Sequence, residues 1–147
     1  MSRALSLLTF PVVRASATYF ALVFGAGFAL GLIRVPFLVP HFGERVAELL
    51  ETPVMLVVIY FASRYVVRRF ALASSARLVV AVGVFALVLL FAAELLLAVA
   101  LQGRSIAGYI SDRDPVSGSV YLASVALYAV MPWLQTRGVR MSARHDA

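Results

Sequence analysis

Residues 78–101 read LVVAVGVFALVLLFAAELLLAVAL, and this stretch decides the class of fold. It carries a single charge, Glu94, over a length sufficient to cross a bilayer core about 30 Å thick at a rise of about 1.5 Å per residue. The whole chain of 147 residues has the same character, because 63% of it is hydrophobic and 14% is charged. A soluble domain carries about 25% charged residues. The composition therefore indicates an integral membrane protein.

Three further apolar segments flank this one, at residues 15–33, 52–67 and 117–134. With residues 78–101 they predict an all-α membrane protein, a four-helix transmembrane bundle that forms a single domain over residues 1–147. Pro36 and Pro40 disfavour helix in the residues before them, so we expect the chain to turn over at the outer surface and to re-enter near Phe42. A short outer interfacial helix is expected before the second span, and residues 1–13 are expected to lie along the inner interface.

The distribution of arginines predicts the orientation. Nine of the 13 basic residues flank one side of the expected bundle, and four (Arg34, Arg45, Arg104 and Arg113) flank the other. The positive-inside rule then places both termini in the cytoplasm of what we take to be a bacterial inner membrane. Anionic inner-leaflet headgroups are the expected partner of an inner basic face formed by Arg64, Arg68, Arg69, Arg77, Arg137, Arg140 and Arg144. No stretch interleaves basic and aromatic residues on a soluble face, so nucleic acid is not an expected partner.

Small residues and prolines suggest how the helices pack. Gly27 and Gly31 share one helix face, where a neighbouring backbone is expected to approach closely within the chain. Pro132 is expected to kink or end the last helix near Ala129.

A stripe of carboxylates precedes the second span. Glu44, Glu48 and Glu51 fall on one face of a helix, and with His41 they have the oxygen-rich chemistry of a site for a hard cation such as Ca²⁺ or Mg²⁺. Ligands of such sites usually converge from separate loops, whereas these acids lie along one helix. We therefore favour a solvated outer face and predict no metal site.

Glu94 is the most unusual polar residue, because an ionised carboxylate within a membrane span is costly. Helical side chains lean toward the helix N-terminus, so Glu94 and Arg34, near the outer ends of parallel spans, both lean into the bilayer. We predict an intramembrane polar pair of Arg34 and Glu94. The pair is either a structural tie that fixes helix register or a group that handles protons or cations.

Few catalytic chemistries fit the composition. The chain has no cysteine, its two histidines lie outside the expected spans, and it contains no phosphate-binding loop or H-E-x-x-H motif, so we predict no enzyme and no cofactor. The leading hypothesis is an accessory, assembly or scaffold subunit that binds another membrane protein or further copies of itself. The second is an oligomeric channel or a proton- or cation-coupled carrier. It ranks second because the polar residues expected within the spans are few and lie scattered along the sequence: Thr52, Tyr60, Ser63, Ser124 and Tyr128.

Overall fold

The computed structural model describes the backbone of residues 2–103, 105–111 and 114–145, and the side chains of residues 10–100, 103, 105, 107–108, 111 and 114–137. All regular elements in the described residues are helices. The long ones are α1 (Ser2–Ile33), α2 (Val39–Arg69), α3 (Ala76–Gln102) and α5 (Pro115–His145). The short ones are the π-helix η1 (Arg34–Leu38), the 3₁₀ turn η2 (Leu72–Ser74) and α4 (Ile106–Ser111).

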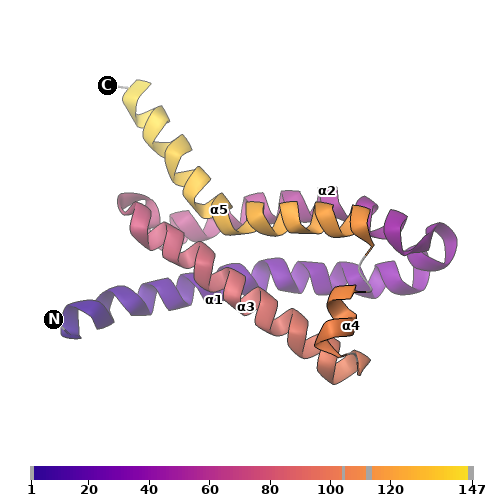
Figure 1. The fold of residues 1–147 in the computed structure, drawn as a ribbon. Coiled ribbons are helices and arrows are strands. Elements are labelled where there is room, and N and C mark those ends of the chain that lie inside the picture. Colours follow the sequence, from indigo (N-terminus) through magenta and orange to yellow (C-terminus); the bar gives the residue numbers. More distant parts are fainter. Residues whose placement is uncertain (1, 104, 112–113, 146–147) are drawn as a thin grey trace.

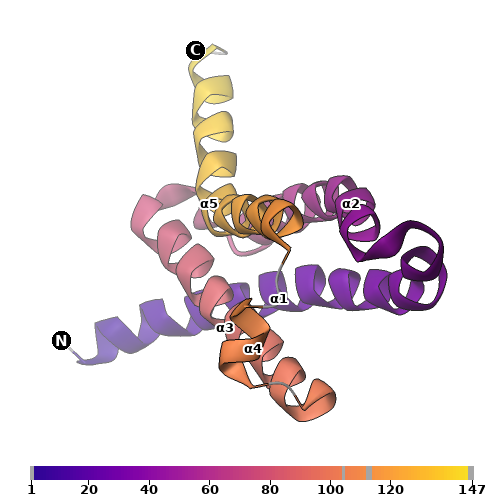
Figure 2. The same ribbon diagram turned by 45° about the vertical axis from the view of Figure 1, so that its right-hand side comes forward.

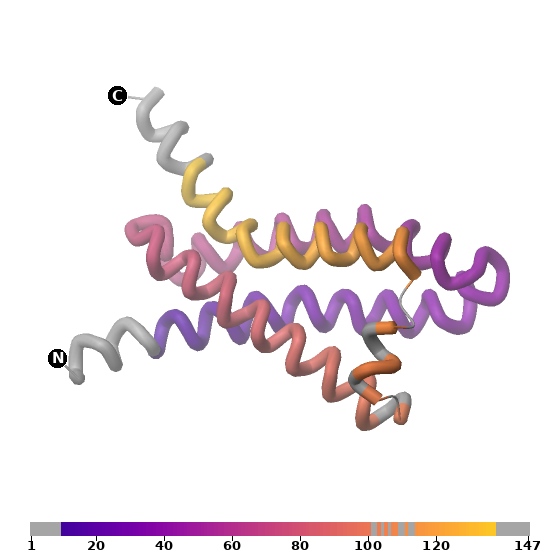
Figure 3. Tube along the Cα trace, in the orientation of Figure 1, coloured from indigo at the N-terminus to yellow at the C-terminus, as the bar shows by residue number. Residues whose placement is uncertain are grey.

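In the described part of the chain, three continuous helical stretches are long and apolar enough to cross a membrane: Phe10–Arg69, Ala76–Ala100 and Pro115–Arg137. The first is 60 residues long and joins α1, η1 and α2. It doubles back on itself, so that α1 and α2 lie side by side in opposite directions (Figure 3). The prediction of an all-helical chain with apolar helices of membrane-spanning length is confirmed.

The four long helices form a ring in which α1 and α5 occupy opposite corners (Figures 1 and 2). Helix α1 packs against α2 and α3, and α5 packs against the same two helices. Two tyrosines close the ring across its diagonal. The rings of Tyr19 and Tyr128 stack with centroids 4.5 Å apart, and the Tyr19 hydroxyl donates a hydrogen bond to the Tyr128 carbonyl oxygen at 2.9 Å. The described core therefore lies around this stacked pair.

The chain reverses at Gly43, next to the predicted point of re-entry at Phe42, but the prolines do not interrupt the helix as predicted. Helical geometry continues through Pro36 because η1 is a π-helix, closed by a bond from the Val39 N–H to the Arg34 carbonyl oxygen. Pro40 falls in the first turn of α2, where a missing N–H donor costs nothing. Gly43 has φ 78° and ψ 163°, a conformation that is essentially restricted to glycine.

Three expected helix boundaries are also corrected. The outer interfacial helix is not a separate element, because residues 44–69 continue as α2 through Pro53. Residues 2–13 belong to α1, which passes through Pro11, so the first helix begins before the predicted residue 15. Helix α5 passes through Pro132 to His145, so it does not end near Ala129, but it changes direction partway along, as the alternative of a kink predicts (Figure 1). An internal proline removes only one backbone hydrogen bond, and the packed neighbours of these helices hold the remaining turns.

Among the described glycines, the tightest contact with a neighbouring helix lies at Gly83 and not at the predicted pair of glycines. A Cβ at Gly83 would lie 2.0 Å from the carbonyl oxygen of Ala129, so α3 and α5 touch through their backbones. A Cβ at Gly27 would meet only the flexible end of Met55 at 3.4 Å, and one at Gly31 would meet nothing within 4 Å. Gly27 and Gly31 border a cavity.

Candidate functional site

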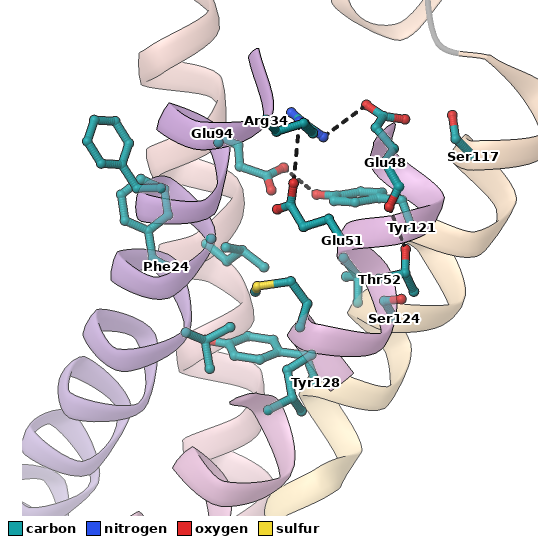
Figure 4. A pocket seen from close by; sticks show the side chains of 18 of the residues that line it. Phe24, Arg34, Glu48, Glu51, Thr52, Glu94, Ser117, Tyr121, Ser124 and Tyr128 are labelled. Atoms are coloured by element: carbon teal, nitrogen blue, oxygen red, sulfur yellow. Dashed lines mark hydrogen bonds and ion pairs between the residues drawn. The ribbon is translucent and has the colours of Figure 1, made fainter. Parts of the chain in front are cut away.

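A cavity of about 710 Å³ lies between the four long helices, at the end of the ring where η1 joins α1 to α2 (Figure 4). All four long helices and η1 contribute to its wall. Its deep part is mostly apolar, whereas its outer part carries charged and hydroxyl groups. The polar residues that line it are Arg34, Glu48, Glu51, Thr52, Glu94, Ser117, Tyr121, Ser124 and Tyr128.

Arg34 forms two ion pairs across the mouth of this cavity. Its Nη1 lies 3.5 Å from Glu48 Oε1, and its Nε lies 3.3 Å from Glu51 Oε2. The side chains of Arg34 and Glu51 are only 25% and 15% exposed, so water screens their attraction weakly. The reversal at Gly43 explains the pairing, because it folds the first turns of α2 back beside η1.

Glu94 accepts a hydrogen bond from the hydroxyl group of Tyr121, which links α3 to α5 (Figure 4). Arg34 and Glu94 line the same cavity, so the structure does bring the predicted pair to one site. Within the described residues, however, the ion pairs of Arg34 go to α2 and do not include Glu94. The predicted partner is thus replaced by acids of the adjoining helix.

The outer carboxylate stripe is divided between two environments. Glu48 and Glu51 face the cavity, whereas Glu44 is exposed and lies outside its wall. His41 is also exposed, and its Nδ1 contacts the Phe37 carbonyl oxygen at 2.7 Å. Throughout the part of the chain that is described, no three His, Cys, Asp or Glu side chains gather closely enough to hold a metal ion.

A second ion pair ties the start of α2 to the start of α5, beside the cavity. Arg45 Nε donates to Asp114 Oδ2 at 2.9 Å, and Asp114 Oδ1 accepts the backbone N–H groups of Val116 and Ser117 at 3.0 Å each. Asp114 therefore caps α5 while it binds Arg45. The hydrogen bond from Arg45, helped by the Ser117 N–H, lowers the pKa of Asp114 to about 2.

The predicted inner basic residues lie at or near the other ends of the helices. Arg68, Arg69 and Arg77 are exposed around the α2–α3 connection. Arg64 donates to the Tyr60 hydroxyl at 3.2 Å, and the guanidinium of Arg137 lies 3.9 Å from the centre of the Trp133 ring. Arg140 and Arg144 fall outside the residues whose side chains are described.

The polar face of α5 was missed by sequence reasoning. Ser117, Tyr121, Ser124 and Tyr128 follow one another at intervals of four, three and four residues and all line the cavity. That spacing places them on one helix face. The same periodicity that revealed the carboxylate stripe would have found this stripe, whose members looked scattered only because they were compared across spans.

Comparison with known proteins identifies no similar protein. No protein-family model matches the chain, and no curated protein or solved structure is detectably similar to it. Its function is therefore argued from the cavity and the groups that line it.

Proposed function

We propose that this chain is a four-pass integral membrane protein that carries a cation in exchange for protons, using the carboxylates of the cavity. The observation that supports this most is that polar side chains from several helices meet at one cavity. Acidic and hydroxyl groups that are far apart in the sequence, on α2, α3 and α5, line one cavity together with Arg34. A carrier needs such groups from several spans at one place.

The proposed placement in the membrane follows from the apolar helices. The 60-residue stretch doubles back at Gly43, so it supplies two passes, and α3 and α5 supply one each. With the exposed arginines Arg68, Arg69 and Arg77 inside, both termini are cytoplasmic and the cavity lies in the outer half of the bilayer. A bacterial inner membrane suits this charge pattern.

Convergence also changes the order of the functional hypotheses. The carrier ranked second because the polar residues of the spans were judged few and scattered, and their common cavity removes that reason. The accessory role stays a prediction that nothing in the fold favours. Four spans are few for a carrier, so we expect it to work as a homo-oligomer.

The exchange chemistry requires a carboxyl group that releases one proton for each cation bound. In the proposed cycle the protonated carboxyl of Glu51 or Glu94 loses its proton to water as the cation binds beside the carboxylate. Protonation from the opposite side then releases the cation. Glu94 also accepts the Tyr121 hydrogen bond, so its protonation changes a contact between α3 and α5.

Proton counterflow in proteoliposomes tests the proposal. Vesicles loaded with a fluorescent pH indicator receive an inward gradient of Na⁺, K⁺ or tetraphenylphosphonium, and release of protons from the lumen is followed. We expect at least one of these cations to drive proton release, and Glu51→Gln or Glu94→Gln to abolish it. Glu44→Gln is the matched control, because Glu44 lies on the same helix but outside the cavity.

Two results would contradict the proposal. Absence of proton counterflow with all three cations would refute the carrier function. Equal counterflow in all three glutamine variants would show that the carboxylates of the cavity are not required. Topology is checked separately with reporter tags at both termini and in the loop after α3. A C-terminal tag that reports the outside would contradict the four-pass arrangement.

A further inference from the structure

We infer that the cavity binds a lipophilic organic cation, a molecule with a positive charge on an apolar or aromatic body. This inference rests on the proposed carrier function and adds the class of substrate to it. The charge, the shape and the apolar walls of the cavity each bear on the choice.

The charge of the cavity favours a cation. Three carboxylates (Glu48, Glu51 and Glu94) and one guanidinium (Arg34) line it, which gives a formal charge of 1 − 3 = −2 when all are ionised. This net negative charge attracts a cation and repels a carboxylate or phosphate ligand, and both effects are stronger in a partly buried site than in bulk water.

The spacing of the carboxylates favours an organic cation over a metal ion. A bare divalent cation needs several oxygen ligands about 2–2.6 Å from one point. In the described residues no three His, Cys, Asp or Glu side chains approach such an arrangement. A cavity of about 710 Å³ is instead within the range of small-molecule sites, about 300–1,000 Å³.

The walls of the cavity supply an apolar and aromatic surface. Phe20, Phe24 and Phe28 stack in succession along α1, with ring centroids 5.1 and 6.4 Å apart, and Phe24 and Phe28 line the cavity. Met55 and Ile59 of α2 form part of the same wall. Aromatic faces attract organic cations, and aliphatic groups favour their hydrocarbon parts.

The rim of the cavity provides a route for such a molecule. Phe28, Leu32 and Val35 line the cavity and are also 50%, 62% and 60% exposed at the surface of the chain. In the proposed membrane these side chains face lipid. A lipophilic cation dissolved in the bilayer would therefore reach the carboxylates between apolar groups.

An unsatisfied hydroxyl at the deep end points independently to an occupant. Tyr128 lies across the floor of the cavity (Figure 4) and is 1% exposed. Its hydroxyl oxygen has no hydrogen-bond partner among the described residues. Buried polar groups are nearly always hydrogen-bonded, so a bound molecule or a water that accompanies it is expected there.

Binding of tetraphenylphosphonium to the full chain in nanodiscs tests the inference, with tetraphenylborate as an anion of nearly the same shape. Empty nanodiscs of the same lipid supply the background. We expect saturable binding of the cation only. Glu94→Gln should weaken it at least tenfold while retaining an oxygen for the Tyr121 hydrogen bond, and Glu44→Gln should leave it within twofold.

A second variant guards against misfolding of the first. Gly31→Leu fills the cavity from a helical position where nothing lies within 4 Å, so it should fold and should weaken binding at least tenfold.

Lack of saturable tetraphenylphosphonium binding, equal binding of tetraphenylborate, or wild-type binding by both Glu94→Gln and Gly31→Leu would overturn the inference. Proton counterflow driven by Na⁺ or K⁺ without tetraphenylphosphonium binding would overturn it and leave the carrier function standing. Tetraphenylphosphonium binding without counterflow would support it and overturn the carrier.

Discussion

The ion pair of Arg34 with Glu51 should be strongly coupled in stability, and a double-mutant cycle of Arg34→Gln and Glu51→Gln measures that coupling. At the observed 3.3 Å, Coulomb's law gives about 5 kcal/mol for an effective dielectric constant of about 20 and about 1.3 kcal/mol for that of water. The side chains of Arg34 and Glu51 are 25% and 15% exposed, so the effective dielectric constant around the pair lies between these two limits. We therefore expect a coupling free energy of about 1–3 kcal/mol.

The single variants should differ in a defined direction. Arg34→Gln removes the partner of both Glu48 and Glu51, so it should lower the free energy of unfolding more than Glu51→Gln does. Reversible unfolding in mixed micelles, followed by circular dichroism, supplies the free energies. The same cycle on Arg34 and Glu94 should give a smaller coupling.

The exposed pair Arg45–Asp114 provides an internal reference, because its side chains are 56% and 28% exposed. A cycle of Arg45→Gln and Asp114→Asn should show weaker coupling than the cavity pair. If the two cycles gave equal coupling, or if Arg34→Gln and Glu51→Gln were additive within about 0.5 kcal/mol, water would screen the cavity pair and the electrostatic reasoning would be refuted.

Three further predictions concern the backbone and the outer ion pair. Gly83→Ala places a Cβ 2.0 Å from a backbone oxygen of α5 and should lower the free energy of unfolding by about 1–3 kcal/mol, whereas Gly25→Ala, with nothing within 4 Å, should be neutral or stabilising by up to about 1 kcal/mol. Gly43→Ala should cost about 1–3 kcal/mol because of the positive φ of 78°, and equal thermal stability of the variant and wild type would contradict the assigned turn. The contribution of Asp114, whose pKa falls from 3.8 to about 2 on folding beside Arg45, should be fully present above about pH 4 and lost as pH falls through about 2. Asp114→Asn keeps a capping oxygen and so isolates the charge, and a stability difference from wild type that did not shrink between pH 5 and pH 2 would exclude this linkage.

Apolar length was the part of the fold that the sequence predicted best. Nearly uncharged runs of about 20 residues predict membrane-spanning helices, because a helix satisfies all its backbone hydrogen bonds within one segment. Turns were harder to locate. Pro36 and Pro40 suggested a break in the helix. The π-helix η1 accommodates Pro36, and the first turn of α2 accommodates Pro40. The reversal itself occurs at Gly43.

The site was predicted only in part, because lateral neighbours depend on how each helix is rotated. Arg34 and Glu94 were expected at one depth, and they do line one cavity. Which acid pairs with Arg34 depends on the fold of the α1–α2 connection, and that is not evident from the depth of a residue in the bilayer. The same limit explains Gly83, which looked like a lone small residue until its backbone contact with α5 was known.

For the proposed four-pass protein, the hairpin of α1 and α2 also has a consequence for how the chain enters the membrane. Both ion-pair partners of Arg34 lie within 17 residues of it, on the other arm of the same hairpin. During synthesis the hairpin can therefore neutralise part of its charge before α3 or α5 leaves the ribosome, which eases its transfer into lipid.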